Sequence, residues 1–210
     1  MYKRTLTILI ATSVAFTAST QVFAYGAGDF FARLGVAKFA PKSDNGSLDT
    51  ALGVLETDVQ DDSAFAFALG YRFTDKLGVE LLASESFDHD FTLAGGAATS
   101  STDHLPPTLA VQYYPLGGTD AYVQPYVGVG VNYTTFSDEK LDGSSAKLEL
   151  DDSWGAAGQL GVDLLIDDRW ALSGAVWYMD IDSDASLDGN DIGKVELDPI
   201  LVMGGISYHF

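Results

Sequence analysis

Large apolar residues occupy every second position along most of the chain. Between residues 64 and 74 they are Phe65, Phe67, Leu69, Tyr71 and Phe73, and the positions between them hold Ala, Gly or Arg. Residues 123–134 and 200–210 repeat this alternation. A hydrophobic period of two predicts β-strands and argues against amphipathic helices.

Eight segments carry the alternation: residues 29–40, 63–74, 78–85, 105–114, 122–134, 153–166, 170–179 and 195–210. The connections between them are alternately short (74–77, 115–121 and 167–169) and long (41–62, 86–104, 135–152 and 180–194). A meander with short turns at one end and long loops at the other is typical of outer-membrane barrels. Strands of about ten residues cross a bilayer when they are tilted.

A soluble eight-stranded barrel of the lipocalin type, or a β-sandwich, is the alternative fold. Its large apolar residues would face inward and its other face would be charged, whereas here the other face is mostly Gly and Ala. Aromatic residues also gather beside the short turns, as in an interfacial girdle: Phe30, Phe73, Tyr113, Trp170 and Tyr208. We therefore predict an all-β fold, an eight-stranded antiparallel up-and-down transmembrane β-barrel with short periplasmic turns and long acidic extracellular loops.

The first 24 residues predict a signal peptide that is cleaved after Ala24. Lys3 and Arg4 precede an apolar stretch from Leu6 to Ala18, and Val22-Phe23-Ala24 is a small-residue cleavage site. Residues 25–210 would then form a single barrel domain in the bacterial outer membrane.

The charge of the chain restricts its partners. Its 210 residues include 11 Lys and Arg, 30 Asp and Glu and no Cys, so the net charge of −19 becomes −21 once Lys3 and Arg4 are removed. Such a chain does not hold nucleic acid through phosphate neutralisation. The lack of Cys excludes disulfides, thiol nucleophiles and thiolate metal sites. Twenty of the acidic residues fall in the four long connections, which predicts solvated acidic loops.

If the large apolar residues face lipid, the opposite parity faces the barrel interior. Near the short turns this parity is charged or hydrogen-bonding: Arg33, Arg72, Glu80, Gln112, Gln124, Asp163, Ser173, Ser207 and His209. We expect a polar floor there, formed by Arg33, Arg72, Glu80 and Asp163, with Arg72 and Glu80 as candidate ion-pair partners.

Further out, the same parity is apolar or small: Ala64, Ala66, Leu82, Gly128, Gly130, Gly155, Ala157, Trp177, Met179, Leu201 and Met203. Leu82, Trp177, Met179, Leu201 and Met203 are the candidate lining of a substrate channel. Two interpretations stay open. The small residues leave room for a ligand, or they let a tightly coiled barrel close around ordinary packing.

This division of the interior predicts passive uptake of small hydrophobic molecules. An ion would lose its water in the apolar half without compensation, and an apolar molecule would stop at the charged floor. Its exit would be sideways into the bilayer, where Pro107, Pro125 and Pro199 each remove a ladder donor from the wall. The alternative function is a non-transporting adhesion or membrane-stabilising barrel that acts through its acidic loops.

The His and Asp residues of the long connections were considered for other chemistry. His89 and His104 share a long connection with Ser and Asp residues, but proximity in a loop does not establish the geometry of a nucleophile and base, so no catalytic residue is expected. Asp180, Asp182 and Asp184 match the start of a calcium loop, but Ala185 stands where Gly is required. We expect no cofactor and no dedicated metal site, only loose binding of divalent cations.

Several motifs resemble the OmpW family of bacterial outer-membrane proteins. They are residues 78–83 (GVELLA), 104–109 (HLPPTL), 126–136 (YVGVGVNYTTF), 152–159 (DSWGAAGQ), 177–181 (WYMDI), 197–199 (LDP) and 208–210 (YHF). The family often has an aromatic residue where Leu164 stands. The resemblance implies an eight-stranded barrel with a narrow hydrophobic channel, associated with uptake of small apolar molecules. It also implies a constriction between a Leu of the third strand and a Trp of the seventh, here Leu82 and Trp177.

The C-terminus, Ile206-x-Tyr208-x-Phe210, resembles the signal that the barrel-assembly machinery reads, with His209 as its inward residue. The expected partners are therefore this machinery, through Phe210, together with outer-membrane lipid and small hydrophobic molecules. The sequence leaves the oligomeric state open.

Overall fold

The computed structural model describes residues 26–42, 47–50, 53–59, 61–84, 87–93, 98–105, 107–141 and 148–210. Within these ranges the chain forms fifteen strands, and no helix among the described residues is long and apolar enough to cross a membrane. The predicted signal peptide lies outside the described residues and stays a prediction.

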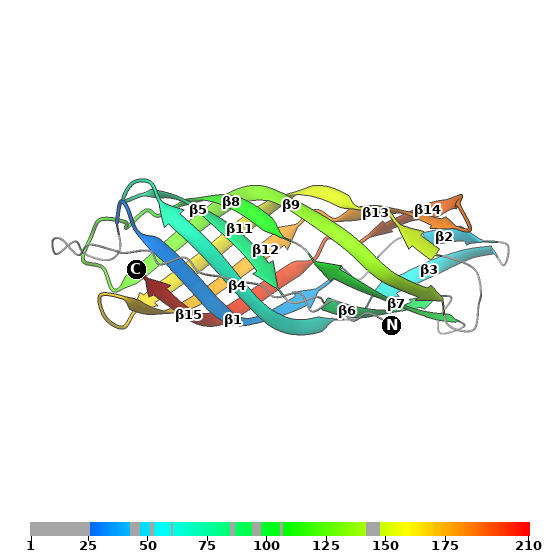
Figure 1. The fold of residues 1–210 in the computed structure, drawn as a ribbon, viewed down its shortest axis with the longest axis horizontal. Helices are drawn as coiled ribbons and strands as arrows, with labels where there is room; N and C mark the ends of the chain where they lie inside the picture. The colour runs from blue at the N-terminus through cyan, green and yellow to red at the C-terminus, as the bar shows by residue number, and fades with distance from the viewer. Residues whose placement is uncertain are drawn as a thin grey trace, which may run out of the picture.

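Eight strands form a closed antiparallel barrel (Figure 1). They are β1 (Phe30–Ala40), β4 (Asp62–Arg72), β5 (Leu77–Ser84), β8 (Thr108–Tyr113), β9 (Val123–Leu141), β11 (Ser153–Leu165), β12 (Trp170–Met179) and β15 (Ile200–His209). Each pairs with its neighbours along the chain, and β15 pairs with β1 to close the barrel. The eight strands expected from the alternation are confirmed, with ends that shift by a few residues.

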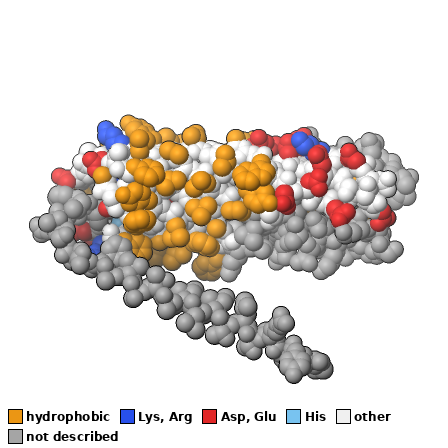
Figure 2. Space-filling view, turned by 45° about the horizontal axis from the view of Figure 1, so that its top comes forward, with side chains coloured by type: hydrophobic (Ala, Val, Ile, Leu, Met, Phe, Trp, Pro, Cys, Tyr) orange, Lys and Arg blue, Asp and Glu red, His pale blue; other side chains and the backbone are white. Residues whose placement is uncertain are grey.

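The outer surface of these strands is an apolar belt between two charged ends (Figure 2). Aromatic rings at the short-turn edge contact one another, as in the pairs of Phe30 with Tyr71 (4.6 Å) and Trp170 with Tyr208 (4.7 Å). Tyr133 and Trp154 form a similar pair toward the other edge, at 4.6 Å. This arrangement is typical of a lipid-facing wall with interfacial girdles. A closed barrel can lie in a membrane because its backbone groups pair between neighbouring strands.

The long connections, which the sequence predicted as acidic loops, contain strands. They hold β2 (Ser47–Thr50), β3 (Gly53–Val59), β6 (Phe87–Leu93), β7 (Ala98–Leu105), β10 (Leu148–Leu150), β13 (Asp182–Leu187) and β14 (Asn190–Glu196). These strands prolong the sheet beyond the apolar belt, at the end opposite the C-terminus (Figure 1). In β13, buried Ser183 and Ala185 alternate with Asp182 and exposed Asp184. Because the outward positions are acidic, the sequence lacks the hydrophobic period of two that marked the membrane strands.

Both ends of the described chain lie at the short turns. The Gly28 amide donates to the Arg72 carbonyl at 2.8 Å, and the Phe210 amide donates to the Phe30 carbonyl at 2.9 Å. The first residues of the barrel domain are therefore tied to the β4–β5 turn, and the last strand is tied to the first.

Candidate functional site

The floor of the interior is built around Arg33, which lies on β1 and faces inward. Its Nη2 atom donates to Asp163 Oδ2 at 2.7 Å, its Nε atom donates to Asp163 Oδ1 at 3.3 Å, and its Nη1 atom binds Glu80 Oε2. All three side chains are at most 3% exposed. One guanidinium group thus ties β1, β5 and β11 together across the interior.

Neutral side chains bind the carboxylates of this cluster as well. Gln159 donates to Glu80 Oε1 at 2.8 Å, and Ser173 donates to Asp163 Oδ1 at 2.7 Å. The Gln159 side-chain carbonyl accepts from Gln112 Nε2 at 2.7 Å, which brings β8 into the network. Because each carboxylate oxygen has a donor, the ion pairs meet the condition under which buried charge is tolerated.

Aromatic rings complete the floor, and sequence reasoning missed them. The Arg33 guanidinium lies 4.3 Å from the centroid of the Phe31 ring and 4.6 Å from that of Tyr126. The register places Phe31 opposite Gly70 and Tyr126 opposite Gly161. A Cβ atom at either glycine would lie 2.0 to 2.2 Å from the ring opposite. An inward aromatic residue facing a glycine on the next strand is the signal that could have found them.

Arg72 does not pair with Glu80, which corrects the partner expected from the sequence. In the β4–β5 register Arg72 lies beyond Glu80 toward the short turn. Its guanidinium lies 4.1 Å from the Tyr114 ring centroid, and its Nη2 atom donates to the backbone carbonyl of Asp75. Glu80 binds Arg33 instead, so Arg72 belongs to the lower edge of the floor.

The outer half of the interior holds the five residues expected to line a channel. Leu82, Trp177, Met179, Leu201 and Met203 are at most 6% exposed and belong to one buried apolar cluster. Almost none of their surface is open to water, so the apolar interior is closed in this structure. Their role as the lining of a route stays a prediction.

The apolar cluster continues past the membrane strands. Ile181, Ala185, Ile192, Val195 and Leu197 belong to it and are at most 9% exposed. They come from β13, β14 and the segments that join these strands to the barrel. The apolar interior therefore extends into a segment that the sequence indicated as a solvated loop.

Inward glycines bring neighbouring backbones close together. A Cβ atom at Gly155 would lie 1.6 Å from the Asp180 carbonyl oxygen, and one at Gly130 would lie 2.1 Å from the Leu109 carbonyl oxygen. At these positions the second interpretation from the sequence fits, in which small residues let the barrel close.

The outer half also holds polar residues that sequence reasoning did not separate from the apolar set. Thr108, Asn132, Thr134 and Ser153 are buried and face inward. Asn132 donates to Thr108 Oγ1 at 2.9 Å, and Thr134 donates to Asn132 Oδ1 at 2.7 Å. These residues alternate along their strands in step with the inward positions Ala110 and Gly130, and this alternation could have indicated from the sequence that they face inward.

A model of the OmpW family matches residues 26–210. The chain belongs to the OmpW family. Outer membrane protein W of Vibrio cholerae is 38% identical over 211 residues, which cover 94% of this chain and 95% of that protein. Outer membrane protein W of Escherichia coli strain K12 is 38% identical over 218 residues, with 100% of both chains covered. The crystal structure of OprG from Pseudomonas aeruginosa is 37% identical, covers 90% of this chain and 99% of that one, and superposes with a TM-score of 0.79.

As an OmpW-family member, the protein is a β-barrel of the Gram-negative outer membrane, which confirms the predicted family, fold class and location. Cleavage after Ala24 stays a prediction. So does the constriction that the family resemblance implied, although Leu82 and Trp177 both face the interior.

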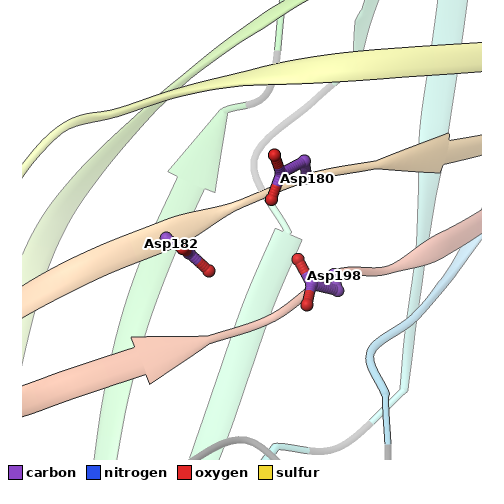
Figure 3. Close-up of side chains that lie close together, drawn as sticks. All are labelled: Asp180, Asp182 and Asp198. Atoms are coloured by element: carbon purple, nitrogen blue, oxygen red, sulfur yellow. The ribbon is translucent and has the colours of Figure 1, made fainter.

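An acidic cluster lies where the membrane strands β12 and β15 of this OmpW-family barrel connect to the outer strands β13 and β14 (Figure 3). Carboxylate oxygens of Asp180, Asp182 and Asp198 lie within 4.8 Å of one another. Lys42 donates to Asp198 at 2.9 Å, and Lys194 donates to Asp182 at 2.6 Å. Burial, followed by the charges of Asp182 and Asp198, raises the pKa of Asp180.

The cluster differs from the calcium-loop pattern considered from the sequence. The third acid of the cluster is Asp198, whereas the sequence pattern had Asp184 in that role. The ammonium groups of Lys42 and Lys194 already bind carboxylates of the cluster. Hydrogen bonds from Lys42 to Glu196 and Asp198 raise the pKa of this lysine, so it stays protonated. No metal is assigned to these residues.

Histidine chemistry gains no support from the described residues. His89 and His104 lie on β6 and β7, but their side chains fall outside the described part of the structure. At the short turns Ser207 Oγ lies 3.3 Å from His209 Nε2, and His209 Nδ1 lies 3.7 Å from Asp29 Oδ2. Ser207 is 0% exposed, so its hydroxyl is not open to solvent in this structure. That the barrel has no catalytic residue stays a prediction.

Proposed function

We propose that the protein takes up small hydrophobic molecules passively through the apolar interior of its barrel and releases them sideways into the bilayer. The observation that carries this proposal is the continuous buried apolar cluster, which runs from Ile192 and Val195 outside the membrane to Leu82 and Met203 inside the barrel. A molecule captured outside would meet apolar side chains along this whole length.

The floor gives the route its lower limit. Below the apolar cluster, Arg33, Glu80 and Asp163 fill the interior with a hydrogen-bonded charge network. An apolar molecule cannot replace these contacts, so passing through the floor would leave buried charges unpaired. The apolar half in turn rejects ions and sugars, because it offers few groups to replace their water.

We place the lateral exit in the wall beside Pro107, which has no backbone N–H to donate to a neighbouring strand. The Pro107 carbonyl accepts from the Tyr133 amide of β9 at 3.0 Å. Because the N–H and C=O groups of one strand residue point to the same neighbour, the missing N–H of Pro107 removes a hydrogen bond between this residue and β9.

Of the other two prolines, Pro125 costs the wall no ladder bond, whereas Pro199 resembles Pro107. Pro125 lies beyond the last described pair of β8 and β9, Tyr113 with Val127, so its missing donor has no acceptor to lose on that side. The Pro199 carbonyl accepts from the Met179 amide at 3.2 Å, so its missing N–H removes a hydrogen bond on that side, as at Pro107. Of the three prolines considered from the sequence, Pro107 and Pro199 are therefore the two that we propose for lateral release.

One relative supports an apolar cargo by its name. The dibenzothiophene metabolism operon protein PahQ of Pseudomonas aeruginosa is 28% identical over 160 residues, which cover 73% of this chain. Dibenzothiophene is a fused aromatic molecule without charge, the kind of compound that an apolar interior would admit.

The proposal is tested in vesicles that carry lipopolysaccharide in their outer leaflet, which slows the passage of apolar molecules. An apolar dye that fluoresces only in hydrocarbon is added outside. We expect the protein to accelerate its appearance in the bilayer, and to have no effect on a charged dye of the same size. A rate equal to that of protein-free vesicles would contradict uptake and turn attention to a surface role of the acidic extracellular strands.

A further inference from the structure

We propose that the barrel interior selects amphipathic ligands, namely small molecules with an apolar body and one hydrogen-bonding group, such as a medium-chain alcohol. This inference rests on the proposed function, because it concerns the selectivity of the same interior. Two observations carry it: the outer half is divided into a polar and an apolar wall, and one buried hydroxyl on the polar wall has no partner.

The polar wall is formed by Ser84, Thr108, Asn132 and Thr134, on the neighbouring strands β5, β8 and β9. Thr108 lies opposite Leu82 of β5 on one side and opposite Asn132 of β9 on the other. Ser84 and Thr134 lie two positions further out on the same inward face. All four residues are at most 7% exposed, so their polar groups are buried on the inward face of three adjacent strands.

The apolar wall is formed by β1, β12 and β15. Phe39, Met179 and Leu201 face inward from these strands and are at most 1% exposed. The Met179 Sδ atom lies 3.8 Å from both Thr108 Oγ1 and Asn132 Nδ2. The two walls therefore contact each other at Met179, so a ligand would displace this flexible side chain and then touch both walls.

Ser84 is the residue of the polar wall whose hydroxyl group is available for a hydrogen bond to a ligand. Asn132 already donates to Thr108 and accepts from Thr134. The Ser84 Oγ atom is buried, and it has no hydrogen-bond partner in the structure. A buried hydroxyl without a partner is destabilising and calls for an explanation. A hydroxyl or carbonyl group of a ligand would supply the missing hydrogen bond.

The chemistry of the two walls defines the ligand class. A pure hydrocarbon would fill the apolar side and leave Ser84 unpaired. A molecule with one hydroxyl group would pack its chain on Met179 and Leu201 and bond Ser84. A charged molecule would meet an apolar wall that cannot replace its hydration.

The test uses Trp177, which belongs to the buried cluster, as a fluorescent reporter. Trp154, Trp170 and Trp177 are the three tryptophans of the chain, so Trp154→Phe and Trp170→Phe leave one emitter in the interior. Binding is read as quenching by two brominated probes of equal size, 8-bromo-1-octanol and 1-bromononane. The ratio of their apparent affinities is compared between the parent protein and its variants, which cancels the different partitioning of the probes into lipid.

We expect Ser84→Ala to lower the affinity for the alcohol relative to the bromoalkane by about three- to tenfold, the contribution of one hydrogen bond. Ser84→Thr, which keeps a hydroxyl, should retain the parent ratio. Ser63→Ala, at an exposed position of β4, should also leave the ratio unchanged.

Two failures are distinguishable. If both probes quench Trp177 and Ser84→Ala leaves their ratio unchanged, the selectivity inference is wrong while the proposed uptake stands. If neither probe quenches Trp177 although the barrel is folded, the proposed function itself fails.

Discussion

Uptake of an apolar probe should fall to the protein-free rate when Leu82 or Trp177 is replaced by Arg. The two side chains are 2% and 1% exposed and lie in the apolar cluster above the floor. The carboxylates of the floor are already paired with Arg33. A guanidinium group placed in the apolar cluster would therefore keep its hydration water or draw water into the interior. The measurement is the rate at which the hydrocarbon-sensitive dye enters lipopolysaccharide-containing vesicles.

Conservative substitutions at the same two positions serve as controls. Leu82→Met and Trp177→Phe keep the apolar character and approximate size, so they should retain most of the uptake. Folding of every variant is checked by heat-modifiable gel mobility. Unchanged uptake in both folded Arg variants would show that the molecules do not pass these residues.

Arg33→Met should destabilise the barrel by about 3–5 kcal/mol, because it leaves two buried carboxylates without their cation. Arg33 binds both Glu80 and Asp163, and all three side chains are at most 3% exposed. The free energy of unfolding is measured by urea titration of the protein in vesicles, where its slope with denaturant reports whether the transition remains cooperative.

Lys38→Met on the same strand is the matched control. Lys38 bridges Asp61 at 2.7 Å, but its side chain is 58% exposed, so its loss should cost about 1 kcal/mol or less. Adding Glu80→Gln and Asp163→Asn to Arg33→Met removes the orphaned charges and should recover part of the stability. Equal losses for Arg33→Met and Lys38→Met would show that the ion pairs do not hold the floor together.

The membrane strands were predictable from sequence because lipid and interior impose opposite demands on alternate residues. The alternate residues from Phe65 to Phe73 face lipid, so all of them are large and apolar and the hydrophobic period of two is clear. The extracellular strands escaped notice because both of their faces tolerate polar residues. In β13 the acids Asp182 and Asp184 indicated a charged loop, although Ser183 and Ala185, which alternate with them, are buried.

Side-chain partners were harder to predict than side-chain direction. Parity alone placed Arg33, Glu80 and Asp163 inside, and the structure brings them together. It did not tell which cation meets Glu80, because that depends on barrel curvature and on side chains that reach across a strand. Arg33 lies two strands from Glu80 and still binds it, whereas Arg72 on the adjacent strand turns toward Tyr114.

The most direct test of the apolar route asks whether an apolar molecule reaches the centre of the barrel. In the Trp154→Phe, Trp170→Phe protein, 1-bromononane added outside should quench Trp177, and Leu82→Arg should abolish this quenching. Two further single-tryptophan proteins keep only Trp154 or only Trp170, each of which faces outward, and report the probe in the bilayer. Quenching of these outer tryptophans while Trp177 stays bright would show that the molecule enters the membrane without passing through the barrel.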